Sequence, residues 1–450
     1  MDRPQTRYAK TADGVHIAYQ ALGEGPGDLV FVPGFVFNVE LSWEWPQLAR
    51  FARRLAGFSR LLMFDRRGSG FSDHIVPSGQ QLTLEARMED IRAVMDAAGS
   101  ERATLLGFEE AFALCAMFAA TYPDRTASLI AIAPAGLGQA DAERPWAYSE
   151  ESWAEYLDGV RRGWGTLEFA EEEGGVVWPG IGDDPEWIRH YADLMRRSVS
   201  PGDALVFLGV DAETDVRAIL PTIRTPTLVV QRTGDEALPI QYGRYFAEQI
   251  PGAVLIELPG SNHAYMSPDQ DEVLDQIEQF VKALRAEEAE LERVLATVLF
   301  TDIVRSTERA AELGDSAWHA LVERHHAAVR GALARYRGVE VDTAGDGFFA
   351  TFDGPARAVK CATSIVEAVE ALGVEVRAGL HTGEVETLDG KVGGIAVAIG
   401  ARICALAGPS EVLASSTVRD LVAGSGLVFE DAGEHQLKGV PDRWRVFRVV

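Results

Sequence analysis

Short apolar runs alternate with helical segments through the first 260 or so residues of this chain. Six of the runs read as strands: "DLVFVPG", "RLLMFDRRGSG", "ATLLGF", "ASLIAIAPA", "PTLVVQRTGD" and "AVLIELPG". Amphipathic helices such as residues 82–98 lie between them. Alternation of this kind builds a mostly parallel β-sheet with helices on both faces, so the sequence predicts an α/β fold for its first part.

The alternation stops between about residues 138 and 220, where the sequence has helical character and several tryptophans. Helices placed this late among the strands suit a cap over the strand ends, where ligands of open α/β sheets bind. An insertion that only buries its own tryptophans fits the pattern equally well. Both interpretations stay open.

A charged helical stretch, "VKALRAEEAELERVLA", separates this part from a different pattern. Its Leu284, Leu291 and Leu295 fall near a heptad spacing but cover too few heptads to establish a coiled coil. We therefore predict a first domain at 1–283 and a helical linker at 284–293.

The remaining residues, 294–450, follow another order of elements. We expect a strand at 294–301, a long helix at about 306–336, a hairpin at 339–352, a helix at 355–371, a strand at 374–382 and a helix at about 396–407. This β-α-β-β-α-β opening is typical of a ferredoxin-like α+β domain whose sheet is covered on one side.

The composition limits the partners of the chain. A formal net charge of −26 over 450 residues disfavours binding to nucleic acid or to an anionic membrane. No window is apolar enough for a membrane helix, and the N-terminus has no apolar signal region, so we expect a cytoplasmic protein. Cys115, Cys361 and Cys404 are scattered in apolar helical context and are expected to be buried thiols.

Four segments of the first domain carry a family resemblance. They are "VPGF" (Val32 to Phe35), "DRRGSGFSD", "RTGDEALP" with Asp235 and "PGSNHAYMSP" with His263. In this order they resemble the α/β-hydrolase family over residues 8 to 283. The resemblance implies that the segment ending at Phe35 forms part of an oxyanion hole, and that Asp235 and His263 are the acid and base of a catalytic triad.

The nucleophile of that family is absent. The turn "LLGFEEAF" matches the place where a hydrolase presents a serine as G-x-S-x-G, but Glu109 stands at the serine position. One hypothesis is an unusual hydrolase whose carboxylate attacks carbon, as an aspartate does in dehalogenases and epoxide hydrolases of this fold. The other is a retired site in which Glu109 pairs with His263 and the pocket binds an unknown small ligand without turnover.

Two segments of the second domain carry aspartates. "VLFTDIVRSTE" and "VDTAGDGFFATF" place Asp302 and Asp346 at a strand end and in a tight turn. Two carboxylates that converge at a sheet edge can hold a pair of hard divalent cations, which clamp a phosphate chain. Free N–H groups at the start of the following helix, at residues such as Val304 and Ser306, could hold phosphate oxygens.

Together with "RAGLHTGEVE", "VGGIAVAIGARI" and "LKGVP", these segments resemble the class III nucleotidyl cyclase catalytic domain from about Val294 to Val450. The resemblance implies a homodimer with active sites across its interface. There ATP or GTP is converted to the 3′,5′-cyclic nucleotide and pyrophosphate with two Mg²⁺ or Mn²⁺ ions. The chain looks like the hydrolase–cyclase fusions of actinobacteria.

The family's roles fall on individual residues of this chain. Asp302 and Asp346 match its metal ligands, with Ile303 in the same metal site. Arg402 matches the arginine that stabilises the pentavalent phosphorus, and Lys438 matches a lysine that contacts the triphosphate.

Three positions depart from the family. Ala398 replaces an asparagine that orients the ribose, and the base-selecting lysine and aspartate are here Asp342 and Lys391, with their charges exchanged. We therefore expect low turnover. The exchanged pair suits guanine, because Asp342 could accept from N1 and N2 while Lys391 donates to O6. Family frequency instead favours ATP. An ion pair between Asp342 and Lys391 would give poor base selection.

Two further hypotheses remain for the whole chain. One is a working hydrolase whose degenerate cyclase domain serves only for dimerisation. The other is a double pseudoenzyme that binds a small ligand and a nucleotide and acts through a partner.

Overall fold

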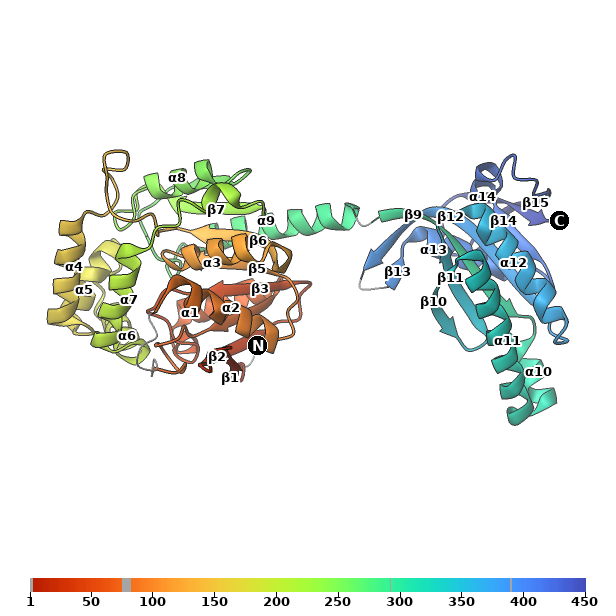
Figure 1. Cartoon of the computed structure of the whole chain (residues 1–450), viewed down its shortest axis with the longest axis horizontal. Helices are drawn as coiled ribbons and strands as arrows, with labels where there is room; N and C mark the ends of the chain where they lie inside the picture. The colour runs from red at the N-terminus through yellow and green to blue at the C-terminus, as the bar shows by residue number, and fades with distance from the viewer. Residues whose placement is uncertain (1–2, 75–81, 292, 389–390) are drawn as a thin grey trace. The chain divides into compact units, whose positions relative to one another are not determined.

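The structure is a computed structural model that describes residues 3–74, 82–291, 293–388 and 391–450. Contacts between residues divide the chain into two compact units, Met1–Ala283 and Leu284–Val450. Each unit has its own sheet and its own buried core (Figure 1).

The first unit is built on one sheet with the strand order β1-β2-β4-β3-β5-β6-β7-β8. Its strands are β1 (Arg7–Lys10), β2 (His16–Leu22), β3 (Asp28–Val32), β4 (Arg60–Phe64), β5 (Ala103–Phe108), β6 (Thr126–Ile132), β7 (Thr227–Arg232) and β8 (Val254–Leu258). Strands β3 to β8 pair in parallel, which confirms the α/β prediction. The antiparallel strands β1 and β2 at one edge were not predicted, since β1 buries only one side chain and has little apolar pattern.

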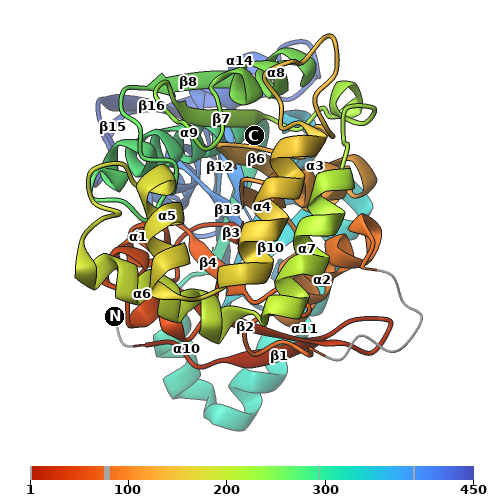
Figure 2. The ribbon, with the colours of Figure 1, turned by 90° about the vertical axis from the view of Figure 1, so that its left-hand side faces the viewer.

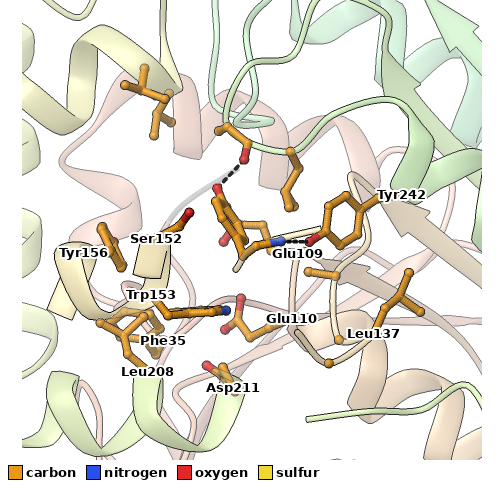
Figure 3. Close-up of a pocket in the computed structure, with 18 of the residues that line it drawn as sticks. Phe35, Glu109, Glu110, Leu137, Ser152, Trp153, Tyr156, Leu208, Asp211 and Tyr242 are labelled. Atoms are coloured by element: carbon orange, nitrogen blue, oxygen red, sulfur yellow. Dashed lines mark hydrogen bonds between the residues drawn. The ribbon is translucent and has the colours of Figure 1, made fainter. Parts of the chain in front are cut away.

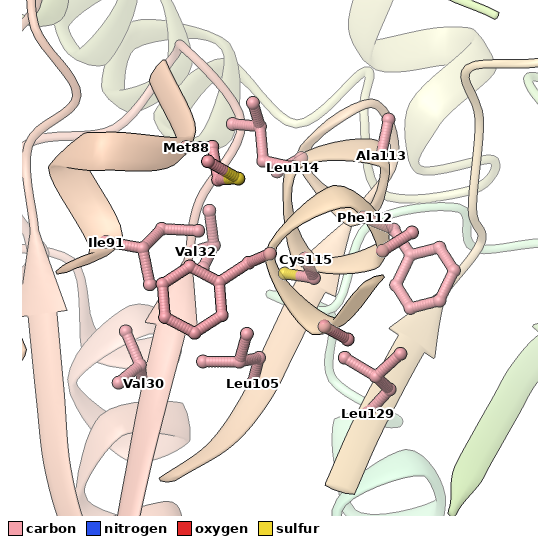
Figure 4. Packing of buried hydrophobic residues seen from close by; sticks show 14 of the residues in the cluster. Val30, Val32, Met88, Ile91, Leu105, Phe112, Ala113, Leu114, Cys115 and Leu129 are labelled. Atoms are coloured by element: carbon pink, nitrogen blue, oxygen red, sulfur yellow. The ribbon is translucent and has the colours of Figure 1, made fainter. Parts of the chain in front are cut away.

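Helices cover both faces of this sheet. One face carries α1 (Pro46–Ala56) and α9 (Gln270–Leu291), and the other carries α2 (Leu84–Ala97), α3 (Ala111–Thr121) and α8 (Gln241–Gln249). Short 3₁₀ helices occur at Leu41–Trp43, Pro123–Arg125 and Leu220–Thr222. Figure 4 shows side chains of the central strands packed beneath α2 and α3. This rigid core fixes the ends of the strands, where the candidate site lies.

Four helices lie between β6 and β7, and Figure 2 shows them grouped together. They are α4 (Glu150–Gly163), α5 (Leu167–Val177), α6 (Pro185–Ser198) and α7 (Pro201–Glu213). Each begins at a Ser, Thr or Asp side chain that accepts a backbone N–H of its first turn. Trp164 is buried among these helices. Trp178 and Trp187 pack instead against Trp45, which belongs to the rest of the unit. The segment therefore buries some tryptophans internally and also packs on the rest of the unit.

The second unit has a sheet with the order β10-β11-β9-β12-β14-β16-β15, and β13 pairs with β12. Its strands are β9 (Arg293–Ile303), β10 (Val339–Ala344), β11 (Gly347–Phe352), β12 (Val376–Leu388), β13 (Lys391–Gly393), β14 (Val412–Ser415), β15 (Phe429–Gln436) and β16 (Arg443–Val449). Its helices are α10 (Ser306–Leu313), α11 (Asp315–Tyr336), α12 (Pro355–Glu370), α13 (Ile395–Leu406) and α14 (Ser416–Leu421). The order β10-β11-β9-β12 is the ferredoxin-like arrangement that the sequence predicts.

Two expectations for this unit were wrong. The helix expected at 306–336 is two helices, because Gly314 adopts a φ of 75° that ends α10. The sheet is also not bare on its second face, because α13 packs there against β9 and β12. Two glycines permit this approach: a Cβ on Gly379 would lie 2.1 Å from the Cys404 nitrogen, and one on Gly400 would lie 2.5 Å from Val298 Cγ2.

Within the described ranges, no helix combines the length and the apolar character that crossing a bilayer requires.

Candidate functional site

The turn between β5 and α3 has the geometry of a nucleophile elbow. Glu109 adopts a φ of 49°, a left-handed conformation that is uncommon for a residue with a side chain. Gly107 makes the close approach of strand and helix feasible, since a Cβ there would lie 2.6 Å from the Phe112 Cα. The turn therefore presents the Glu109 side chain at the carboxyl end of the sheet, where a hydrolase presents serine.

Glu109, His263 and Asp235 form a continuous hydrogen-bonded row. Nδ1 of His263 lies 2.7 Å from Oδ2 of Asp235, and Nε2 of His263 contacts Oε1 of Glu109. The His263 and Asp235 side chains are 1% exposed, whereas 33% of the Glu109 side chain is exposed. Three residues distant in sequence, each predicted for this pocket, thus meet at one point.

The electrostatics of this row differ from those of a working triad. Burial alone would lower the pKa of His263, but the carboxylates of Asp235 and Glu109 outweigh it and raise the pKa to about 10. A cationic imidazole has no free lone pair with which to take a proton from a nucleophile. At neutral pH, His263 is therefore an ion-pair partner and not a general base.

A second glutamate alters the place where an oxyanion would sit. A Cβ on Gly34, next to Phe35, would lie 3.6 Å from Glu110 Oε1 and 3.9 Å from Glu109 Oε2. Glu110 also receives a 2.6 Å hydrogen bond from the buried guanidinium of Arg66. Two acidic side chains thus stand beside the predicted oxyanion hole, where acyl transfer requires hydrogen-bond donors aimed at the developing negative charge.

Burial raises the pKa of Glu110 to about 8, with a further increase from the charge of Asp211 and a partial offset from Arg66. The sequence pattern singled out Glu110 only as a departure from a motif. Its pairing with Arg66 depends on a contact across 44 positions of the chain that no local pattern reveals.

A cavity of about 280 Å³ opens above the elbow, between the strand ends and helices α4, α5 and α7 (Figure 3). Aromatic side chains line much of it: Phe35, Tyr148, Trp153, Tyr156 and Tyr242. Four acids also belong to its wall: Glu109, Glu110, Glu173 and Asp211. Phe35 and Glu109 were predicted for this pocket from the sequence. Glu173 and Asp211 were not, and helices α5 and α7 bring them to the site.

The pKa of His263 leads to a prediction about stability. Since the folded-state pKa of about 10 exceeds the ordinary 6.5, the stabilisation is fully present below pH 6.5 and is lost as the pH rises through about 10. We expect the melting temperature of the first unit, followed by tryptophan fluorescence, to fall over this interval. Glu109→Gln removes one of the two carboxylates and should move the fall to lower pH. A profile unchanged by Glu109→Gln would contradict the ion-pair assignment.

In the second unit, Asp302 lies near the end of β9 and Asp346 in the turn between β10 and β11. The Ile303 N–H donates to Oδ2 of Asp346 at 3.1 Å, which links the two segments. Burial raises the pKa of Asp346, and the charge of Asp302 raises it further, so the two carboxylates are close enough to repel each other. Arg377 on β12 donates to Oδ2 of Asp302 through Nε, at 3.1 Å, and through Nη2.

Two histidines of α11 hold the turn that carries Asp346. Nε2 of His325 lies 3.2 Å from the Asp346 carbonyl oxygen, and Nε2 of His326 lies 3.0 Å from that of Gly345. Neither was identified from the sequence. The phosphate-binding role suggested for Val304 was wrong, because its N–H donates to the Glu375 carbonyl at 2.9 Å.

The predicted phosphate contacts lie on an open surface of this unit. Arg402 and Lys438 are both exposed, and Nε of Arg402 donates to the Lys438 carbonyl at 3.1 Å. Ala398 and Ile395 precede Arg402 on the exposed side of α13, where Ile395 is 56% exposed.

The two predicted base-recognition residues are placed unequally. Asp342 on β10 is exposed, and its Oδ1 accepts the backbone N–H of Thr343. Lys391 begins β13, but its side chain lies outside the described residues.

The carboxylates at the β9 end suit hard divalent cations. Two aspartates and the backbone oxygens beside them are the oxygen ligands that Mg²⁺ and Mn²⁺ prefer. Among the described residues, no group of three or more His, Cys, Asp or Glu side chains could hold a metal ion. The donor set thus fits a metal that is shared with a phosphate chain.

Comparison with protein families matches both units. The model described as "Alpha/beta hydrolase family" matches residues 29–276, and that described as "Adenylate and Guanylate cyclase catalytic domain" matches residues 289–449.

Individual relatives agree with this division. A Pimeloyl-[acyl-carrier protein] methyl ester esterase of Chromobacterium violaceum is 28% identical over 274 residues, which cover 60% of this chain and 97% of the esterase. "Putative adenylate cyclase 3" of Rhizobium meliloti is 28% identical over 160 residues, 33% of this chain and 27% of that protein. An uncharacterised protein of Rhizobium meliloti is 30% identical over 181 residues, and the chain spans only 18% of its length. The crystal structure of bromoperoxidase from Bacillus anthracis shares the fold, with a TM-score of 0.53 at 22% identity, covering 62% of this chain and all of that one.

Proposed function

Since the chain belongs to the alpha/beta hydrolase family and continues into an adenylate and guanylate cyclase catalytic domain, we propose that it is a nucleotidyl cyclase whose first unit binds a ligand without hydrolysing it. The observation that carries the proposal is the pair of carboxylates, Asp302 and Asp346, held together by the Ile303 N–H at one edge of the second sheet. The product is the 3′,5′-cyclic nucleotide, formed with loss of pyrophosphate.

In this proposal Asp302, Asp346 and the backbone of Ile303 hold two Mg²⁺ or Mn²⁺ ions. When bound, such ions neutralise the phosphate chain and favour attack of the 3′-hydroxyl on the α-phosphorus. Arg377 donates to Oδ2 of Asp302 and would share that carboxylate with the ions. Arg402 and Lys438 supply positive charge to the phosphates.

A homodimer completes the site. Arg402 lies on an exposed side of α13 together with the apolar Ile395 and Leu406, which are 56% and 40% exposed. Exposed apolar side chains next to an arginine are typical of protein–protein interfaces. A second copy of the chain would cover them and bring Arg402 to the partner's aspartates.

Base selection is expected to depend on Asp342 and Lys391. We propose ATP as the substrate because family frequency favours it. We expect weak selectivity over GTP because Asp342 is exposed and, among the described residues, accepts a hydrogen bond from the Thr343 N–H alone. The double variant Asp342→Lys/Lys391→Asp restores the lysine and aspartate order of adenylyl cyclases and should raise the ratio of ATP to GTP turnover. The kcat/KM values for both nucleotides measure this ratio. An unchanged ratio would mean that these residues do not contact the base.

The proposal is tested on the purified full-length protein with ATP and GTP in parallel, with Mn²⁺ or Mg²⁺, and with a chelator as control. Cyclic nucleotide that depends on the metal supports it. A folded dimer that forms neither product would overturn it.

Ester or epoxide hydrolysis by Glu109, with a degenerate cyclase domain used for dimerisation, is a second candidate. One observation favours it: the elbow conformation of Glu109 is kept, with His263 and Asp235 behind it. The cationic state of His263 and the acidic side chain of Glu110 beside the predicted oxyanion hole oppose it. Turnover of a chromogenic ester that disappears in His263→Ala would establish this function in place of the first.

A further inference from the structure

We infer that the cavity above the elbow binds a small organic ammonium cation. The inference rests on the proposed function, in which the first unit is a ligand-binding unit, and it specifies the chemical class of that ligand. Three features of the cavity carry it: the aromatic walls, the acids that face it, and the placement of the basic side chains.

Aromatic side chains from four parts of the first unit contribute to the walls. Trp153 and Tyr156 come from α4, Tyr148 precedes that helix, Tyr242 lies on α8 and Phe35 follows β3 (Figure 3). Aromatic faces attract a cation through the ring quadrupole, most strongly where water is excluded. They also cover the apolar groups that surround an alkylated nitrogen.

The side chains of the walls that can carry charge near neutral pH are acids. Glu109, Glu110, Glu173 and Asp211 line the cavity, and Asp211 contributes an oxygen, Oδ2, that has no hydrogen-bond partner among the described residues although the side chain is only 5% exposed. A buried acceptor without a partner is costly to leave unpaired. A donor from a bound ligand would satisfy it.

The basic side chains lie behind the acids. Arg66 pairs with Glu110 at 2.6 Å and Arg87 with Asp211 at 2.9 Å, but neither guanidinium belongs to the cavity wall. A negatively charged ligand would therefore meet carboxylates first. This order of charges selects against anions.

The charges around the cavity do not balance. His263 is shared between two carboxylates, Asp235 and Glu109. Within the described part of the chain Glu173 has no ion pair, and its hydrogen-bond partner is the Tyr156 hydroxyl at 3.4 Å. Burial raises the pKa of Glu173 to about 7, since it leaves the charge of the ionised form without compensation. A monocation beside Glu173 supplies that compensation.

The test uses three probes of nearly equal shape and different charge: choline, its neutral isostere 3,3-dimethylbutan-1-ol, and the anion 3,3-dimethylbutanoate. Binding to the full-length protein is measured at pH 8 by isothermal titration calorimetry, without nucleotide or metal. We expect choline to bind on the order of tenfold more tightly than the alcohol, as expected for a cation among aromatic rings and a carboxylate. The anion should not bind.

Variants locate the site. Glu173→Gln should weaken choline binding by on the order of tenfold while leaving the alcohol unaffected, because only the charge of the wall changes. Glu172→Gln is the matched control, since this neighbouring glutamate of α5 is exposed and does not line the cavity. Equal affinity for cation and alcohol, absence of choline binding at high millimolar concentration, or binding unaffected by Glu173→Gln would each overturn the inference. Since the assay involves no turnover, its outcome is independent of that of the cyclase assay.

Discussion

Asp346→Asn should abolish metal-dependent cyclic nucleotide formation. Asn keeps the size of the side chain and can still accept the Ile303 N–H, but it removes the negative charge that holds a divalent cation. Metal ions supply several kcal/mol of charge stabilisation in phosphoryl chemistry, so we expect turnover to fall by at least about a hundredfold. The measurement is product formation over time with saturating ATP and Mn²⁺.

The control is the same substitution a few residues away. Asp353→Asn changes an exposed aspartate that follows β11 and pairs with Arg357. This aspartate is close to Asp346 in the sequence but is not a predicted metal ligand. It should leave turnover unchanged, and both variants should melt like the parent protein. If Asp346→Asn retained full metal-dependent activity, the assignment of Asp346 as a ligand would be wrong.

Gly379→Ala should destabilise the second unit and displace Arg402. The new Cβ would lie 2.1 Å from the nitrogen and 2.4 Å from the Cα of Cys404, so the backbone of α13 has to move away from β12. Overpacking of a core costs about 1–3 kcal/mol, and the backbone contact places this variant at the upper end. Since α13 carries Arg402, activity should fall as well. Calorimetric unfolding of the full-length protein measures the first effect.

Gly331 provides the matched comparison. It lies in the exposed interior of α11, and a Cβ there would meet no atom within 4 Å. Gly331→Ala should therefore stabilise the unit by about 0.5–1 kcal/mol through helix propensity. If the two glycine variants changed stability equally, the close approach of α13 to β12 would not be the cause.

The sequence predicted the parts of this protein that repeat a local pattern. The parallel strands β3 to β8 are runs rich in apolar residues, and the β10–β11 hairpin is marked by its glycines, so each follows from its own residues. The break in the long helix at Gly314 was not predicted. A glycine in a helical context does not by itself mark a break, and the positive φ that ends α10 is seen only in the structure.

The candidate site was predictable only where a motif marks it. Glu109, Asp235 and His263 lie on motif positions, and they meet as expected from the order of the segments. Glu173 and Asp211 lie on cap helices without any motif, and their place in the cavity depends on how those helices pack. Likewise, the ion-pair state of His263 depends on the two carboxylates that the fold brings to its ring, which the residue type alone does not determine.

The conformation of Glu109 has a consequence for protein engineering. A left-handed backbone costs an ordinary residue about 1–2 kcal/mol, and no serine is present here to make use of it. Backbone hydrogen bonds hold the bend, from the Glu109 N–H to the Ile132 carbonyl and from the Ala135 N–H to the Glu109 carbonyl, and Gly107 packs closely against Phe112. A designer who wished to install a new hydrolase in this scaffold would inherit the bend and the histidine already in place. The task would be one of removing charge, at Glu109 and Glu110, rather than of reshaping the chain.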